Sequence, residues 1–221
     1  MQETSIHGVF RKGDKLYTKN PVHTRGIKVY NEKLYSYKNE EFRSWNPYRS
    51  KLAAGIKKKI TPSFLPTYHV LYLGAAMGTT VSHIADIVSD GIVYAVEHTP
   101  LAMNALLKVS EVRQNIIPIL EDANHPDRYA SFLNPVDILY QDISQRNQAS
   151  IFIQNVDRYL KKNGLGILMV KARSIDVAKK PKEAYDIVVK ELKEAGLKIL
   201  SITELSPYDK DHAMIVTSSS D

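Results

Sequence analysis

Three carboxylates each follow an apolar run in the middle of this 221-residue chain. They are Glu97, Asp122 and Asp142, which come after the runs 92–96, 116–120 and 136–140. In open α/β sheets, ligands bind beyond the carboxyl ends of the parallel strands. We therefore expect the three carboxylates to line one binding site, and we expect Glu97 to accept hydrogen bonds from the two hydroxyls of a ribose.

A glycine turn precedes the first of these runs. Gly74 and Gly78 lie in Tyr-Leu-Gly-Ala-Ala-Met-Gly-Thr-Thr, after the apolar run 70–73 and before a helical pattern. Two glycines four apart allow a tight strand-to-helix turn, in which the backbone approaches a ligand and the helix amides face it. The loop lacks the Gly-x-Gly-x-x-Gly pattern of dinucleotide sites. It therefore favours S-adenosylmethionine as the nucleoside cofactor.

Lys171 ends the most apolar predicted strand, 166–171, next to the strand that leads into Asp142. If both side chains point to the carboxyl edge of the sheet, they pair there. The carboxylate would then orient the amine toward a hydroxyl group. Residue type alone leaves Lys51 as an ordinary surface lysine and His212 as a structural histidine.

The elements that must position these residues alternate strand and helix, which predicts an α/β fold with a sheet of about seven strands. A long amphipathic helix is expected at 182–194, closed by Gly196. The last two runs, 198–205 and 213–217, are too close for a parallel crossover and predict an antiparallel C-terminal edge. The tail from 217 to 221 is expected to be frayed.

Residues 1–50 are predicted to form a small basic β-rich domain, and residues 51–221 the cofactor-binding domain. Strands are expected at 8–12, 15–19, 27–30 and 33–37, with turns at Gly13-Asp14 and Asn31-Glu32. Ser50 is a suitable N-cap for a helix over 51–58.

The net charge of +6 is unevenly distributed. The first 60 residues carry 14 Lys or Arg against 5 Asp or Glu, whereas the other 161 carry 16 against 19. This asymmetry indicates a polyanionic partner such as nucleic acid, with a merely solubilising surface as the alternative.

The chain has no cysteine, which excludes disulfides, thiolate metal ligands and thiol nucleophiles. We expect no metal site. The sequence shows no signal-type segment and no run of the ~18 apolar residues that a membrane helix requires. We therefore expect a soluble, cytoplasmic protein without a membrane partner.

Five segments that span nearly the whole chain resemble the fibrillarin family in its compact archaeal form. They are 43–54 (RSWNPYRSKLAA), 74–80, 93–97, 115–123 and 207–213 (PYDKDHA). The resemblance implies a Rossmann-like class I methyltransferase domain that uses S-adenosylmethionine. It departs from the commonest pattern at Met77, His98 and Asn124, where a small Ser, an aromatic residue and an Arg are usual. The Gly/Arg-rich tail of eukaryotic members is missing.

By that resemblance a Lys-Asp-Lys-His tetrad is catalytic, and a second set of residues contacts the cofactor. The tetrad would be Lys51, Asp142, Lys171 and His212. The cofactor contacts would be Gly74, Ala76, Gly78, Thr79, Thr80, Glu97, His98, Asp122, Ala123, Asp142 and Gln145.

The implied activity is methyl transfer to ribose 2′-hydroxyls of ribosomal RNA, with transfer RNA as a further candidate substrate. The implied partners are a C/D box guide RNA, the target RNA, a Nop-type scaffold protein and a kink-turn-binding ribosomal-type protein. We expect Lys171, held by Asp142, to take the hydroxyl proton. Two alternatives stay open: a methyltransferase of the same fold acting on protein, for example on a glutamine side chain, or on small molecules; and a non-catalytic RNA-binding scaffold.

Overall fold

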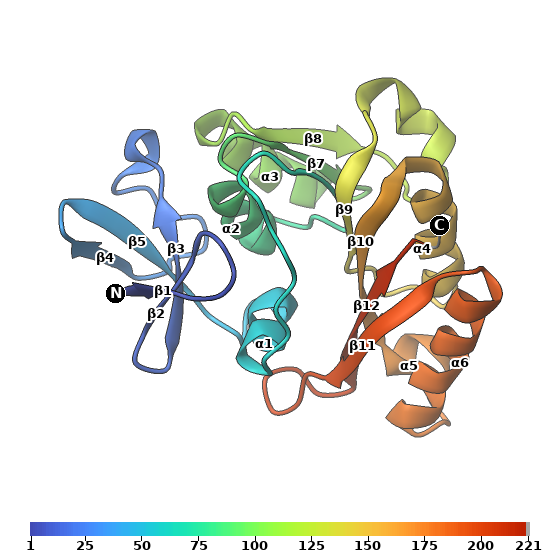
Figure 1. Ribbon diagram of the computed structural model, residues 1–221. Helices are drawn as coiled ribbons and strands as arrows, with labels where there is room; N and C mark the ends of the chain where they lie inside the picture. The colour runs from blue at the N-terminus through green and yellow to red at the C-terminus, as the bar shows by residue number, and fades with distance from the viewer. Residues whose placement is uncertain (220–221) are drawn as a thin grey trace.

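The computed structural model describes residues 1–219 and contains two β-sheets that α1 connects (Figure 1). The N-terminal sheet is antiparallel, with the order β1-β2-β3-β5-β4. Its strands are β1 (Gln2–Glu3), β2 (Val9–Lys12), β3 (Lys15–Asn20), β4 (Leu34–Tyr37) and β5 (Glu40–Trp45), with a short 3-10 helix η1 (Val22–Thr24).

The second sheet has seven strands in the order β11-β12-β10-β9-β6-β7-β8. They are β6 (His69–Leu73), β7 (Ile92–Glu97), β8 (Ile116–Leu120), β9 (Val136–Gln141), β10 (Leu160–Lys171), β11 (Lys198–Glu204) and β12 (His212–Ser218). β12 runs antiparallel to both of its neighbours, and the pairs from β10 to β8 are parallel. The chain order reverses between β6 and β9, which is where open α/β sheets bind ligands. The predicted fold class is confirmed.

Helices cover both faces of this sheet, because its central strands are apolar on both sides. On β6, Val70 and Tyr72 pack into one core cluster, while Leu71 and Leu73 pack into the other. The helices on the first face are α1 (Lys51–Lys57), α2 (Thr79–Ile87) and α3 (Pro100–Val112). On the second face lie α4 (Gln148–Tyr159), α5 (Ala172–Ile175), α6 (Pro181–Glu194) and the 3-10 helix η2 (Pro126–Phe132).

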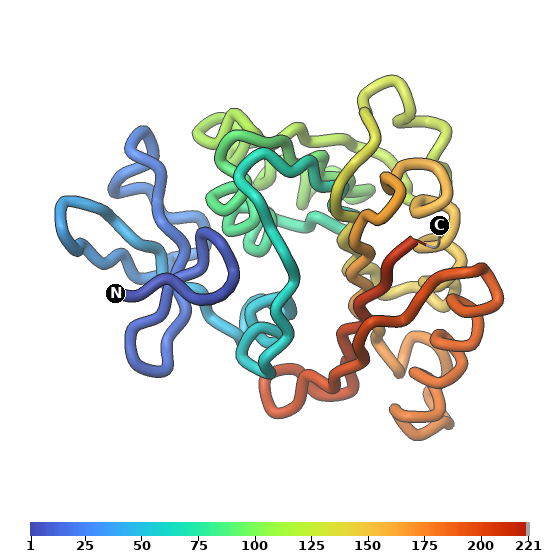
Figure 2. The backbone as a smooth tube through the Cα atoms, in the orientation of Figure 1, coloured from blue at the N-terminus to red at the C-terminus, as the bar shows by residue number. Residues whose placement is uncertain are grey.

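The N-terminal sheet packs against α2. Val9 and Trp45 belong to the same core cluster as Val81 and Ile84 of α2. The loop between β11 and β12 lies beside α1 (Figure 2), and Lys58 Nζ, just after α1, donates to Ser206 O at 3.0 Å. The division of the chain at residue 50 stays a prediction, although Ser50 does cap α1 by accepting from Ala53 N.

The strand expected at 27–30 was wrong, and so was the turn at Asn31-Glu32. The buried Glu32 carboxylate accepts the amides of Val29 and Tyr30, which holds this segment in a loop. The hairpin turn is instead at Lys38-Asn39, where both residues have positive φ, and it joins β4 to β5.

The expected fraying of the tail was wrong for residues 217 and 218, which lie in β12. Residues 220 and 221 lie outside the described residues. Within residues 1–219, no helix is long and apolar enough to cross a membrane.

Candidate active site

The loop after β6 is fixed by close backbone packing. The amides of Gly74 and Ala75 both donate to Val96 O at 3.0 Å. Gly74 has φ +83, and a Cβ atom there would lie 2.4 Å from the carbonyl oxygen of Asp142. Gly78 has φ +86, and its Cβ would lie 3.1 Å from Leu106 of α3. The two glycines are therefore required for contacts within the protein as well as for the turn.

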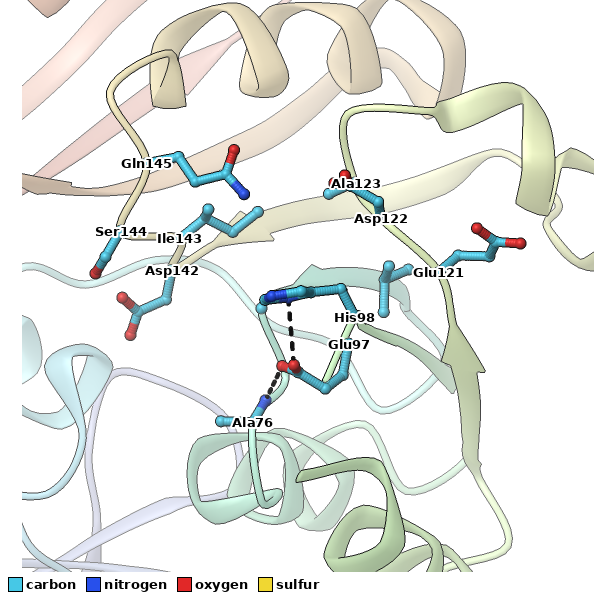
Figure 3. Close-up of a pocket in the computed structure, with 12 residues that line it drawn as sticks. Ala76, Glu97, His98, Glu121, Asp122, Ala123, Asp142, Ile143, Ser144 and Gln145 are labelled. Carbon is cyan, nitrogen blue, oxygen red and sulfur yellow. Dashed lines mark hydrogen bonds and ion pairs between the residues drawn. The ribbon is translucent and has the colours of Figure 1, made fainter. Parts of the chain in front are cut away.

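A cavity of about 350 Å³ opens at the carboxyl ends of β6, β7, β8 and β9. Figure 3 shows Asp142 and Gln145 on one side of it, Asp122 and Ala123 on the other, and Glu97 and His98 between them. Its lining residues are Gly74, Ala76, Val96, Glu97, His98, Glu121, Asp122, Ala123, Asp142, Ile143, Ser144 and Gln145.

Three of the predicted cofactor residues do not line this cavity. Gly78 and Thr80 are buried at the start of α2, where Thr80 Oγ1 donates to Ser50 Oγ at 3.0 Å, and Thr79 stands between them. Conversely, Val96, Glu121, Ile143 and Ser144 line it and were not predicted. Each of these four residues is next to a predicted one. Their position at or just after the strand ends could therefore have identified them from the sequence.

Glu97 ties the end of β7 to the glycine loop. Its Oε2 accepts the amide of Ala76 at 2.9 Å, and its Oε1 accepts the amide of Thr99 at 2.8 Å (Figure 3 shows the first bond). Ala76 has φ +47, a conformation that is costly for a residue with a side chain. The bond from Glu97 therefore stabilises the loop. Oε2 keeps a second lone pair for a ligand, whereas Oε1 also lies 3.4 Å from His98 Nδ1.

Asn124 connects the loops that follow β8 and β9. Its backbone and side-chain amides donate to Asp122 Oδ1, and its side chain also donates to Gln145 Oε1 at 3.0 Å. Asn147 Nδ2 in turn donates to Asn124 Oδ1 at 2.8 Å. Desolvation raises the pKa of Asp122, but the two bonds from Asn124, together with the nearby His125 and His98, outweigh it and lower the pKa overall. Asp122 is therefore an anionic acceptor at neutral pH.

The cavity fits a nucleoside that carries a positive charge. Glu97 and Asp122 supply acceptors for ribose hydroxyls and an exocyclic amine, and Asp142 adds a negative charge at the far side. Gly74 and Ala76 bring the loop backbone to the edge of the cavity. These features match the donors and the charge of S-adenosylmethionine.

Asp142 also faces a lysine from the first helix. Lys51 Nζ lies 2.9 Å from both carboxylate oxygens of Asp142, and 3.9 Å from Oδ2 of Asp209. Lys51 is the first residue of α1, so the Ser50 cap that starts the helix also sets the position of this amine. This ion pair places the amine of Lys51 beside Asp142, which lines the cavity.

His212 meets the same group of residues through Asp209. Its Nδ1 lies 2.8 Å from Asp209 Oδ1 and 2.9 Å from Lys210 O. Both partners are acceptors, so Nδ1 must carry a proton. Asp209 therefore links Lys51 to His212, a role that the sequence analysis missed.

Lys171 is near this group, but it does not form the expected pair with Asp142. Its backbone pairs with His212 across β10 and β12, and its amide donates to Gln148 Oε1 at 3.1 Å. Within residues 1–219, no carboxylate lies within ion-pair distance of its amine. The reason is the register: Leu168 pairs with Gln141, so Lys171 lies beyond the level of Asp142 along the strand.

The sheet order, the antiparallel β12 and the acid-lined cavity at the carboxyl edge are those of the Rossmann-like methyltransferases. The sequence profile of the fibrillarin family matches residues 1–221. The chain therefore belongs to the fibrillarin family, as the resemblance implied.

Relatives and solved structures agree with this assignment. A fibrillarin-like rRNA/tRNA 2′-O-methyltransferase from Methanocaldococcus jannaschii is 48% identical over 204 residues, which cover 91% of this chain and 87% of the relative. The structure of Aeropyrum pernix fibrillarin with natively bound S-adenosyl-L-methionine has a TM-score of 0.87 and 40% identity, covering 98% of this chain and 96% of that one. Fibrillarin from a fibrillarin/Nop5p complex has a TM-score of 0.91 and 41% identity, covering 99% and 100%.

Proposed function

We propose that this protein transfers a methyl group from S-adenosylmethionine to ribose 2′-hydroxyls of ribosomal RNA, and of transfer RNA as a second substrate, under the direction of a C/D box guide RNA. One observation carries the proposal: Asp142 lines the cofactor cavity and also binds Lys51. The methyl donor and the amine of Lys51 would then meet at one carboxylate. The name of the M. jannaschii relative supports the same activity.

When bound, S-adenosylmethionine supplies an electrophilic methyl group. Glu97 and Asp122 would hold the nucleoside part, and Asp142 lies at the end of the cavity nearest Lys51. Most of the acceleration comes from aligning the 2′-hydroxyl with that end of the cavity and from removing its proton as the bond forms.

Lys171 is our candidate for the group that takes the hydroxyl proton. Its amine has no carboxylate partner among the described residues, so it is free to turn toward an incoming hydroxyl. Lys51, held by Asp142, positions the ribose. His212 is the second candidate, because a neutral ring with the proton on Nδ1 keeps a lone pair on Nε2.

Target choice depends on partners in this proposal. A Nop-type scaffold protein is supported by the similarity to fibrillarin in the fibrillarin/Nop5p complex. The guide RNA, the target RNA and a kink-turn-binding protein are inferred from the family. The excess of 14 Lys or Arg over 5 Asp or Glu in the first 60 residues supplies positive charge for RNA phosphates.

The test is transfer of label from S-adenosylmethionine to a target RNA, with and without the assembled guide complex. We expect one labelled ribose at the guided position, and no transfer when the guide sequence is scrambled. Label in protein instead of RNA would favour the protein methyltransferase. No transfer to either, together with guide-RNA binding, would favour the non-catalytic scaffold.

A further inference from the structure

A buried glutamine lies beside the backbone of Lys171. Gln148 is the first residue of α4, and it is 0% exposed. Both ends of a buried amide need hydrogen-bond partners, because an unsatisfied polar group in the protein interior costs free energy. The partners of Gln148 therefore show which parts of the chain this side chain holds in place.

Both ends of the Gln148 amide bond to the backbone of Lys171. The Lys171 N–H donates to Gln148 Oε1 at 3.1 Å, and Gln148 Nε2 donates to the carbonyl oxygen of Lys171 at 3.3 Å. A backbone N–H can only donate, so the amide oxygen must face it and the amide nitrogen must face the carbonyl. The side chain thus exchanges with Lys171 the two bonds that opposite residues of paired strands exchange.

The neighbouring strand β9 ends before it reaches the level of Lys171. The last residue of β9 is Gln141, and its partner on β10 is Leu168, three residues before Lys171. On its other side, the backbone of Lys171 is paired with His212 of β12. Gln148 therefore takes the place of β9 beside Lys171 and holds the end of β10 on the side opposite β12.

Gln148 is also bonded to the loop that carries cofactor residues. Its Nε2 donates to the carbonyl oxygen of Gln145, which lines the cofactor cavity, at 3.1 Å. Its own carbonyl oxygen accepts Nε2 of the buried Gln141 at 2.6 Å. One residue therefore joins the end of β9, the loop after Asp142 and the strand end that carries Lys171.

We propose that Gln148 is a positioning residue for methyl transfer. Its amide fixes the backbone of Lys171 relative to the loop after Asp142, and so sets the point from which the Lys171 amine reaches the 2′-hydroxyl. The catalytic part of this role rests on the proposed function. A helix start then positions each of the two lysines, because Ser50 caps α1 just before Lys51 and Gln148 begins α4.

The first test measures the bond to Lys171 without any methyl transfer. NMR follows hydrogen exchange of the backbone amides in the full-length protein. The Lys171 amide should be protected in the wild type, and Gln148→Met, which has a similar volume but no amide, should speed its exchange about fivefold or more. The Leu168 amide, inside the sheet, should exchange at the same rate in both proteins. Gln154→Met is the matched control, because Gln154 is an exposed residue of the same helix.

The second test uses the assembled guide complex. Gln148→Met should lower kcat about tenfold or more, because small displacements of a reacting group are costly in rate, and should leave KM for the target RNA unchanged. Gln154→Met should match the wild type. A merely structural role would instead lower the thermal unfolding temperature and speed amide exchange throughout β10, while the folded variant kept its kcat.

The two tests separate the positioning role from the proposed function. An unprotected Lys171 amide in the wild type, or equal exchange in the wild type and Gln148→Met, overturns the positioning role even if the protein methylates RNA. Unchanged kcat in Gln148→Met overturns it as well. If the wild type transfers no methyl group to RNA, the proposed function fails and the catalytic role is overturned with it, although exchange at Lys171 still depends on Gln148. Should Gln148→Met not fold, Gln148→Asn replaces it, because its amide is one methylene too short to reach Lys171.

Discussion

His83 makes the stability of this protein sensitive to acid. It lies on α2 and is fully buried, with Nδ1 2.7 Å from Thr18 Oγ1, Nε2 2.8 Å from the Tyr30 hydroxyl, and its ring stacked on Trp45. Burial lowers the pKa of His83 well below 6.5, and the nearby guanidinium groups of Arg43 and Arg113 lower it further. The folded protein therefore keeps this imidazole neutral.

The size of the effect follows from proton uptake on unfolding. In the unfolded chain a histidine has a pKa of about 6.5, so in acid the unfolded chain binds one more proton than the folded protein does. The stability from this group is fully present above that pKa and is lost as the pH falls. Between about pH 7 and about pH 5, the free energy of unfolding should fall by about 2 kcal/mol on account of His83 alone.

Urea unfolding of the wild type and of His83→Gln, followed by the fluorescence of the single tryptophan, measures this contribution. The glutamine cannot be protonated, so the variant should be less stable near neutral pH but should lose about 2 kcal/mol less on acidification. His23→Gln is the control, because His23 is exposed and outside the buried network. Equal pH dependence in wild type and His83→Gln would refute a neutral, buried His83.

The remaining predictions concern the active site. Glu97→Gln should weaken S-adenosylmethionine binding about tenfold or more in calorimetry, because a charged acceptor is lost. Glu111→Gln, on the surface of α3, is the control and should leave the affinity unchanged. Equal affinities of the two variants would reject the proposed ribose contact. Gly74→Ala should lower the unfolding free energy by more than the roughly 1–2 kcal/mol expected for the positive φ alone, since its Cβ also meets a backbone oxygen at 2.4 Å. Gly13→Ala is the control, because Gly13 has positive φ and open space around it. Similar losses of unfolding free energy in the two variants would show that the structure relieves the clash between the Cβ added at residue 74 and the Asp142 oxygen. Lys171→Ala should abolish methylation in the label-transfer assay and keep cofactor affinity within a few fold; retained turnover would assign the proton transfer to another group.

The sequence was sufficient for the central sheet because its strands are buried on both faces. Continuous apolar runs such as 70–73 and 92–96 predicted β6 and β7, and strand ends located most of the cofactor cavity. A strand that is buried on both faces is a continuous run of apolar residues, which can be recognised in the sequence. The position of the carboxyl ends then follows from the alternation of strands and helices.

Pairings between distant side chains were not predictable in the same way. The expected Lys171–Asp142 pair failed because the register of β10 against β9 places Lys171 too far along its strand, and nothing in residue types fixes a register between parallel strands. Asp209 was missed because its partners come from α1 and β12. The segment 27–30 was mistaken for a strand because the bonds from the Glu32 carboxylate to the backbone amides of Val29 and Tyr30 leave no periodic signal.

A buried polar network connects the N-terminal sheet to the helix that follows the glycine loop. Arg43 of β5 donates to Ser82 at 2.9 Å and to Asp86 at 2.6 Å, and both of these residues lie on α2. The same helix begins directly after Gly78, at the end of the loop whose first residues line the cofactor cavity. The guanidinium of Arg43 is fully buried, so moving the N-terminal sheet away from α2 would break its buried ion pair with Asp86. The N-terminal sheet and the cofactor cavity are therefore held in a fixed relation by one helix.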